Sequence, residues 1–258
     1  MKLRFLLGTL ALASLVSCAS KFKKQCEATN WFEHGKSVAL SGNRLNSNDF
    51  VQRCQKEDVD VNEAQVDLGF KAGMGIYCTA RGAEDTGRKG DRLNPNLCDP
   101  GIFSALEISW EKGRNEYCSP ANGYKVGALG EEYKGVCPEK MEKAFLKRFN
   151  RGKMVYFTNM IDAKTQEIRH LENRRNESRG NISRIERQRT QVMAAHKITQ
   201  LRWSAPNPEA EAKYQSEMDT LDSRLRSEQR EARNLDTKIE GLQAEIADLR
   251  VKRGAFSE

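Results

Sequence analysis

The sequence lacks any apolar run long enough to cross a membrane as a helix, which would need about 20 consecutive apolar residues. Prolines are scarce, at six in 258 residues, so a proline-rich linker protein is excluded. Hydrophobic residues still make up 38% of the chain, and with seven cysteines they argue against a fully disordered protein. The length is sufficient for one or two folded domains.

Common catalytic and nucleotide-binding motifs are also missing. The chain has no His-Glu-x-x-His, no paired Cys/His spacing for zinc and no Gly-x-Ser-x-Gly elbow. Gly73 and Gly75 are too few for a dinucleotide-binding loop. His34 would serve as a base for a cysteine nucleophile only if a cysteine were free, and the acidic residues 57–60 are typical of a solvated loop. We therefore expect no enzyme, no metal and no cofactor other than a covalent lipid.

That lipid is expected from the first 17 residues, which have the pattern of an export signal. Lys2 and Arg4 precede a short apolar run over residues 5–16. The sequence Leu15-Val16-Ser17-Cys18 resembles the lipobox of bacterial lipoproteins. The resemblance implies cleavage before Cys18, a diacylglycerol on its thiol and acylation of the new amino group. Several acyl chains hold a protein stably on a bilayer, whereas one does so only marginally.

The expected location of the protein is therefore the bacterial cell envelope, with a lipid anchor in the membrane. The residue after Cys18 is Ala19 and not an aspartate. This resembles the outer-membrane sorting signal of enterobacterial lipoproteins. We expect the protein at the outer membrane, facing the periplasm, with residues 18–25 as a linker. An ordinary secretory signal with an unmodified Cys18 is the alternative. Nucleic acid is not an expected partner in this compartment.

The other six cysteines all lie between residues 26 and 137. Their even number fits disulfides, which persist in exported proteins. Six cysteines allow 15 pairings. We expect bonds between sequence neighbours, namely Cys26–Cys54, Cys78–Cys98 and Cys118–Cys137.

A repeated pattern accompanies these cysteines. The order aromatic-x-x-Gly-x-x-x-Tyr-Cys occurs at residues 70–78 and again at 110–118, with looser copies near Trp31, Tyr124 and Phe149. On a helix the aromatic residue, the glycine and the tyrosine would share one face, and the glycine would let a second backbone approach closely. We predict short packed helices over residues 26–152, joined by turns such as residues 119–123.

The same region resembles a family of small Gram-negative lipoproteins that is known only as a domain of unknown function. The resemblance extends over roughly residues 26–152. It rests on Trp31, Gly35, Tyr117, Cys118, Pro120, Asn122, Gly123, Tyr124, Gly127, Gly130, Tyr133, Cys137 and Pro138. It implies an envelope lipoprotein and supplies no catalytic residues.

Residues 153–258 have the pattern of an antiparallel helical hairpin. Two stripes with steps of four and three residues run from Phe157 to Trp203 and from Tyr214 to Leu249, and residues 204–208 contain the prolines that separate them. The fold class expected for the whole chain is all-α. A stripe of this kind serves an intramolecular hairpin and a homo-oligomer equally well. Charged and polar residues at Arg175, Ser178 and Arg189 weaken the first stripe at its centre.

Charge is distributed unevenly over this hairpin. Residues 140–202 carry 16 Lys+Arg and 6 Asp+Glu, whereas residues 209–258 carry 9 and 12. One interpretation is that the two helices neutralise one another. The other is that the basic helix binds an anionic envelope component or an acidic protein. The residues expected to do so are Arg174, Arg175, Arg179, Arg184, Arg187 and Arg189.

Three functions remain open from the sequence. The favoured one is a non-catalytic, lipid-anchored envelope protein whose charged hairpin binds another envelope component. The second is a glycan- or peptidoglycan-binding module that uses Trp31, Trp110, Tyr77, Tyr117 and Tyr124, although at helical spacing these side chains more often fill a core. The third is a cell-wall enzyme, for which the sequence offers no constellation of residues.

Overall fold

The structure is a computed structural model that describes residues 21–202 and 207–257. Within these ranges all regular structure is helical, as predicted. The described chain forms two compact units. The cysteine unit contains the described residues up to Val126 together with Glu131–Phe149, and the hairpin unit contains Gly127–Gly130 and the described residues from Asn150 onward. Cys18 and the export signal lie outside the described residues.

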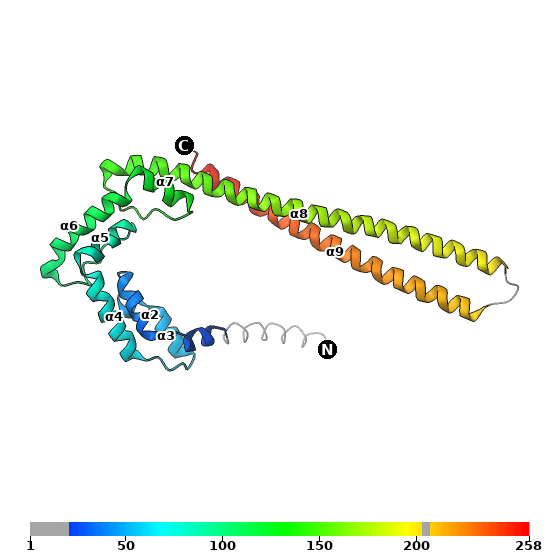
Figure 1. The fold of residues 1–258 in the computed structure, drawn as a ribbon, viewed down its shortest axis with the longest axis horizontal. Coiled ribbons are helices and arrows are strands. Elements are labelled where there is room, and N and C mark those ends of the chain that lie inside the picture. The colour runs from blue at the N-terminus through cyan, green and yellow to red at the C-terminus, as the bar shows by residue number, and fades with distance from the viewer. Residues whose placement is uncertain (1–20, 203–206, 258) are drawn as a thin grey trace, which may run out of the picture. The chain divides into compact units, whose positions relative to one another are not determined.

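The cysteine unit is built from short helices, which Figure 1 shows in blue to green. Residues 21–27 are helical. The helices that follow are α2 (Trp31–Leu40), the 3-10 turn η1 (Leu45–Ser47), α3 (Asp49–Lys56), α4 (Glu63–Tyr77), α5 (Ala80–Arg88), α6 (Pro100–Tyr117) and α7 (Pro120–Ala128). Most begin at an Asn, Asp or Thr whose side-chain oxygen accepts a hydrogen bond from the first turn. Short side chains of this kind define where each helix starts.

Close packing of helix pairs explains the repeated glycines. Helix α4 packs on α2, and α6 packs on α5. A Cβ atom on Gly113 of α6 would lie 1.9 Å from the carbonyl oxygen of Glu84, and one on Gly87 of α5 would lie 2.2 Å from that of Trp110. Only glycine permits this approach of two backbones. The prediction that the repeated glycines lie at helix–helix contacts is confirmed.

The disulfides follow the same repeat. Cys78 and Cys98 stand two residues before α5 and α6, and Cys118 and Cys137 stand two residues before α7 and the helix that begins at Glu139. Cys26 and Cys54 instead lie inside helical segments. The three bonds are Cys26–Cys54, Cys78–Cys98 and Cys118–Cys137, the neighbouring pairs that we expected. Their sequence separations of 28, 20 and 19 residues close loops of similar size.

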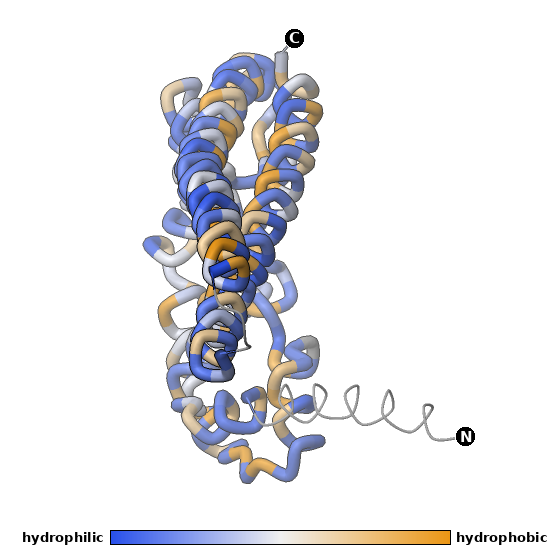
Figure 2. The backbone as a smooth tube through the Cα atoms, turned by 90° about the vertical axis from the view of Figure 1, so that its right-hand side faces the viewer, coloured by the Kyte–Doolittle hydropathy of each residue, from blue (hydrophilic) through white to orange (hydrophobic). Residues whose placement is uncertain are grey.

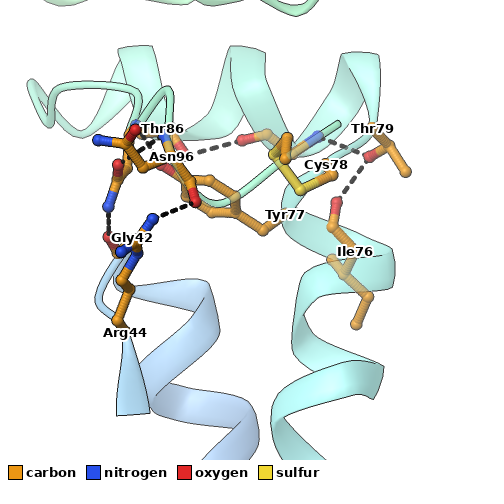
Figure 3. The surroundings of a disulfide bond; sticks show 11 residues. Gly42, Arg44, Ile76, Tyr77, Cys78, Thr79, Thr86 and Asn96 are labelled. Atoms are coloured by element: carbon orange, nitrogen blue, oxygen red, sulfur yellow. Dashed lines mark hydrogen bonds between the residues drawn. A yellow bond between two sulfur atoms is a disulfide. The ribbon is translucent and has the colours of Figure 1, made fainter. Parts of the chain in front are cut away.

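Each long helix ends with its repeated tyrosine against a glycine that has positive φ. The ring of Tyr77 lies beside Gly42, where φ is 72°, and the ring of Tyr117 lies beside Gly90, where φ is 68°. Figure 3 shows the first of these contacts next to the Cys78 disulfide. A side chain at either glycine would be strained and would also meet the ring. A third copy occurs in the hairpin unit, where Gly130 faces Tyr156.

Arginines link successive copies of the repeat. Arg44 Nη2 donates to the carbonyl oxygen of Asn96 at 3.0 Å, and Figure 3 shows this bond. Arg92 Nη2 donates to the carbonyl oxygen of Gly135 at 3.4 Å. Each arginine stands two residues after a positive-φ glycine, and each acceptor stands two residues before a cysteine. The equivalent position in the third copy is Glu132, so the linking arginine is absent where the repeat ends.

The predicted turn at residues 119–123 is wrong. Residues 120–128 form α7, whose first turn begins at Pro120. The backbone N–H of Gly123 donates to the carbonyl oxygen of Ser119 at 2.9 Å. Proline is well tolerated at the first helical position, because its missing N–H would have no partner there. The Pro and Gly of this segment therefore mark the start of a helix instead of a loop.

Two long helices make up most of the hairpin unit. Helix α8 extends over Glu139–Arg202 and α9 over Pro208–Gly254. The hydrophobic stripe begins at Phe157, but α8 itself begins 18 residues earlier, next to residue 140, where the predicted basic helix begins. Figure 2 shows apolar residues scattered along both helices in short segments, as expected for helices that bury only one stripe.

The hairpin has its main core near the ends Phe157 and Leu249. Phe157, Ile161, Ile168 and Leu171 of α8 pack with Leu235, Ile239, Ile246 and Leu249 of α9. The ring of Phe256 stacks on that of Phe157 at 5.8 Å. Phe157 occupies the position that a cysteine holds in the two clearest copies of the repeat. The helix therefore continues where the other copies turn at a disulfide.

Candidate functional site

The ion pairs between α8 and α9 establish that the two helices are antiparallel. Lys164 pairs with Glu245, Arg174 with Glu231, and Arg189 with Asp222. Near the turn, His196 Nε2 lies 3.2 Å from a carboxylate oxygen of Glu211. The residue numbers rise along one helix as they fall along the other. The stripe that predicted a coiled coil thus forms an intramolecular hairpin, which Figure 1 shows in green to orange.

The weak centre of the predicted stripe is a polar layer in which side chains of α8 bind α9. Ser178 is 4% exposed, and its hydroxyl donates to Glu228, whose carboxylate oxygen lies at 2.5 Å and whose carbonyl oxygen lies at 3.1 Å. Asn181 Nδ2 donates to the Glu228 carboxylate at 3.2 Å. Arg175 Nη1 donates to Asp236 at 3.2 Å. Buried polar groups with specific partners favour one register over sliding.

The structure brings most of the six candidate arginines against α9. Arg174 pairs with Glu231, Arg175 and Arg179 share Asp236, and Arg189 pairs with Asp222. These four guanidinium groups are thus already matched by carboxylates of the same chain. They stabilise the pairing of α8 with α9, each exposed pair by roughly 0.2–1 kcal/mol.

The other two arginines, Arg184 and Arg187, form no ion pair with the described residues of α9. Arg184 Nη1 donates to the side-chain oxygen of Asn181 at 3.2 Å. Arg187 is exposed and makes no ion pair within the described part of the chain. Counted over both helices, residues 157–258 carry 19 Lys+Arg and 17 Asp+Glu. The hairpin is therefore a basic helix beside an acidic one, with little net charge.

Packing between the helices changes toward the turn. The His196 ring stacks on that of Tyr214, with ring centroids 3.8 Å apart and planes 9° apart. On the side of this pair that is farther from the turn, the two helices leave a groove of about 710 Å³ between them. Its walls include Gln188 and Val192 of α8 and Thr220 and Leu221 of α9. The distal half of the hairpin thus has less apolar contact than the core around Leu171 and Leu235.

Apolar side chains on the distal part of α8 are exposed instead. Ile198 is 59% and Leu201 80% exposed. Ala194 is also exposed. It lies on the same face as Ile198 and Leu201, because residues at i, i+4 and i+7 lie one above another on a helix. We call Ala194, Ile198 and Leu201 the distal stripe. Residues 190–201 contain one charged residue, Lys197, in a chain with 31% charged residues.

Sequence reasoning missed the distal stripe because it followed only the seam. Ile198 and Leu201 fall outside the seam positions, so the seam pattern treats them as solvent-facing. A signal was present in the sequence, however. Apolar residues outside the seam coincide with a segment that is nearly free of charge, and this combination is unusual for a solvent-facing helix.

Most aromatic residues proposed for glycan binding have structural roles. Tyr77 and Tyr117 are 1% and 4% exposed, and burial raises the pKa of both hydroxyl groups. The Trp110 indole N–H donates to the carbonyl oxygen of Asp91 at 2.8 Å, and the Arg114 guanidinium lies 4.8 Å from the ring centroid. Trp110 also borders a cavity of about 250 Å³ with Phe103, Arg92 and Glu107.

The described residues offer little for covalent or metal chemistry. All six cysteines of residues 26–137 are in disulfides, so none provides the free thiol that a cysteine nucleophile requires. Over residues 21–202 and 207–257, no group of three or more His, Cys, Asp or Glu side chains is arranged to hold a metal ion. In the same ranges, every helix is too short or too polar to cross a bilayer.

Comparison with known proteins gives one family. A family model described as "Protein of unknown function (DUF2799)" matches residues 30–115 and again residues 104–154. The second match begins inside the first, within α6, as expected where a chain repeats a similar helical pattern. No curated protein and no solved structure matches the chain. Residues 30–154 are thus similar to this family of uncharacterised domains.

Proposed function

We propose that this protein is a non-catalytic, lipid-anchored component of the bacterial cell envelope whose helical hairpin binds another envelope component. The observation that carries the proposal is the distal stripe. Ile198 and Leu201 are large apolar side chains that are exposed next to the stacked His196 and Tyr214 rings of the seam. Exposed apolar side chains that are contiguous on a surface commonly mark a site of protein interaction.

The geometry of the stripe favours a helical partner. Ala194 is small, and Ile198 and Leu201 stand one and two turns further along the same face. A small residue beside larger apolar ones allows a second helix to approach and to pack over the larger side chains. Arg187 lies two turns before Ala194 on this face. The stripe thus has an apolar centre and one basic end.

Only two of the six candidate arginines are proposed to attract the partner directly, whereas the sequence suggested all six. Four of the six hold α9, so they contribute to binding by keeping the hairpin straight and in register. Arg184 and Arg187 are exposed, form no ion pair with the described residues of α9, and supply the positive charge that would attract an anionic partner surface. The basic helix thus steers the partner, and the distal stripe holds it.

The anchor is part of the proposal. The lipobox-like sequence ending in Cys18 supports lipidation, and three disulfides in the cysteine unit fit an oxidising compartment. We propose the outer membrane, with the chain facing the periplasm. Mass measurement of the mature protein tests the anchor alone, because acylation adds the mass of the lipid to Cys18.

Capture by chemical crosslinking in intact cells tests the proposed binding. The Ile198→Glu/Leu201→Glu double variant should lose the crosslinked species that the unaltered chain forms, since two carboxylates would be placed on the apolar contact. The matched control is Asn173→Glu, an exposed site on the same helix about 38 Å nearer Phe157. If the double variant is captured as well as the control, the distal stripe is not the binding site.

A second candidate function is glycan binding at the cavity beside Trp110. It is favoured by the combination of two aromatic rings with Arg92 and Glu107 around one cavity, since sugar rings stack on aromatic faces and bond to charged side chains. Sedimentation of the full-length, unlipidated chain with purified sacculi tests it. Retention that is lost in Glu107→Lys and kept in Lys125→Glu would favour this function over the first.

A further inference from the structure

The first copy of the repeat carries an aromatic cluster around Phe50. The Phe22 and Phe50 rings meet edge to face at 5.9 Å, and the Trp31 ring lies 6.1 Å from Phe50. The His34 ring lies 5.0 Å from that of Phe50 and 6.0 Å from that of Trp31. Phe22, Trp31 and Phe50 are all half-buried, so their rings are only partly covered by protein.

Basic side chains surround this cluster. Lys21, Lys23 and Lys24 belong to the same helical segment as Phe22, and Arg53 and Lys56 belong to the helix that carries Phe50. The Arg53 guanidinium lies 4.4 Å from the centroid of the Phe22 ring. Among residues that the structure describes, none of the five forms an ion pair with a carboxylate. Glu27 and Asp49 are the acidic residues on these two helices.

A disulfide holds the two helices together. Cys26 follows Lys24 by two residues. Its bond to Cys54 fixes residues 21–27 against α3. Both cysteines are fully buried. The aromatic and basic side chains are therefore displayed by a preformed surface, which lowers the ordering cost of binding.

We propose that this surface, formed by Phe22, Trp31, Phe50, Lys21, Lys23 and Arg53, docks on an anionic phospholipid membrane. Aromatic rings favour the interface between water and lipid, and nearby Lys and Arg side chains are attracted to an anionic surface. The chain between Cys18 and Lys21 reaches at most about 11 Å. If Cys18 carries the proposed lipid, the surface therefore lies next to the bilayer, and on that point the inference rests on the proposed function.

The surface would orient the cysteine unit on the membrane. A lipid anchor alone leaves the attached domain free to rotate, because it fixes only one point. A second contact through the aromatic cluster removes that freedom. The surface also supplies a second membrane signal, and two signals bind a membrane much more stably than one.

Vesicle binding of an unlipidated chain tests the inference separately from the anchor. The protein is the full mature chain from residue 18 with Cys18→Ser, and the probes are phosphatidylcholine vesicles with or without phosphatidylglycerol. We expect binding only to vesicles that contain phosphatidylglycerol, with affinity that falls as salt is added. The Lys21→Glu/Lys23→Glu variant should bind at least about tenfold more weakly.

The matched control is Lys89→Glu/Lys125→Glu, which changes the net charge equally at two exposed sites elsewhere in the cysteine unit. It should retain binding. Trp31 provides a second readout: in a chain with Trp110→Phe and Trp203→Phe, its emission should shift to shorter wavelength on anionic vesicles. Equal binding to both vesicle types, no binding at all, or equal losses in the two lysine pairs would overturn the inference. None of these results would bear on lipidation of Cys18.

Discussion

Ser178 of α8 donates its hydroxyl hydrogen to Glu228 of α9 across the seam of the hairpin, with the carboxylate oxygen at 2.5 Å and the backbone carbonyl oxygen at 3.1 Å. This contact stands where the hydrophobic stripe of α8 is weakest, between Leu171 and Ile185. A serine in a coiled-coil seam removes apolar contact. It also gives the pair of helices one position where only a single register satisfies a buried polar group.

We therefore predict that Ser178→Ala destabilises the hairpin by about 1–3 kcal/mol, since a buried hydrogen bond between side chain and α9 is lost. The midpoint of urea unfolding measures the loss. Thr237→Ala is the control, because the Thr237 hydroxyl is exposed and bonds only within α9. Its effect should stay within about 0.5 kcal/mol. Equal midpoints for both variants would show that the polar layer contributes nothing to stability.

Because α5 and α6 approach closely, we predict that replacement of glycine by alanine has opposite effects on stability at Gly113 and Gly75. Gly113→Ala should lower stability by about 1–3 kcal/mol, because the new Cβ would overlap the carbonyl oxygen of Glu84. Gly75→Ala in α4 should instead raise stability by roughly 0.5–1 kcal/mol, because nothing lies within 4 Å of its Cβ position. Thermal unfolding of both variants measures the contrast. A stable Gly113→Ala protein would contradict the helix pairing described here.

The raised pKa values of tyrosines in the cysteine unit predict that the folded state loses stability at alkaline pH. Burial and the hydrogen bond to the Glu142 carboxylate raise the pKa of Tyr133 to about 12. In the unfolded chain the hydroxyl ionises near pH 10. Stability is thus fully present below about pH 10 and falls as the pH rises through about 12, because the unfolded chain releases a proton that the folded chain keeps.

The measurement is urea unfolding at several pH values across this range, together with phenolate absorbance. Tyr133→Phe should be less stable near neutral pH, since it loses the bond to Glu142, and should depend less steeply on pH above 10. Tyr77 and Tyr117, whose pKa values are also raised, account for the remaining dependence. An unchanged slope in Tyr133→Phe would assign the alkaline effect to other groups.

The apolar patterns in the sequence predict the skeleton of this fold. The seam period predicts Leu171, Leu235 and Ile239 as core, and all three are buried. The Gly–Tyr spacing predicts a helix face that meets another backbone. Both patterns are local consequences of helix geometry, so they can be recognised in a single chain. The hydrophobic stripe does not extend to the part of α8 before Phe157, because Phe145 and Phe149 of that segment pack against Tyr133 and not in the hairpin seam.

The candidate site could be predicted only in part. The sequence identifies the arginines of α8 but not their partners, since pairing with Asp222, Glu231 and Asp236 depends on the register of the hairpin. Once that register is known, most of the apparent positive charge is matched by α9. Exposure of Ile198 and Leu201 likewise follows from which face α9 covers, and the seam pattern alone gave no reason to consider the opposite face.

Site-specific photo-crosslinking in living cells tests the central proposal most directly. A photoreactive residue is placed at Ile198 in one chain and at Asn173 in another, so that the two probes lie on one helix about 38 Å apart. We predict one dominant adduct from position 198, absent from position 173 and lost when Leu201→Glu is added. No adduct at position 198, or the same adduct at both positions, would contradict binding through the distal hairpin.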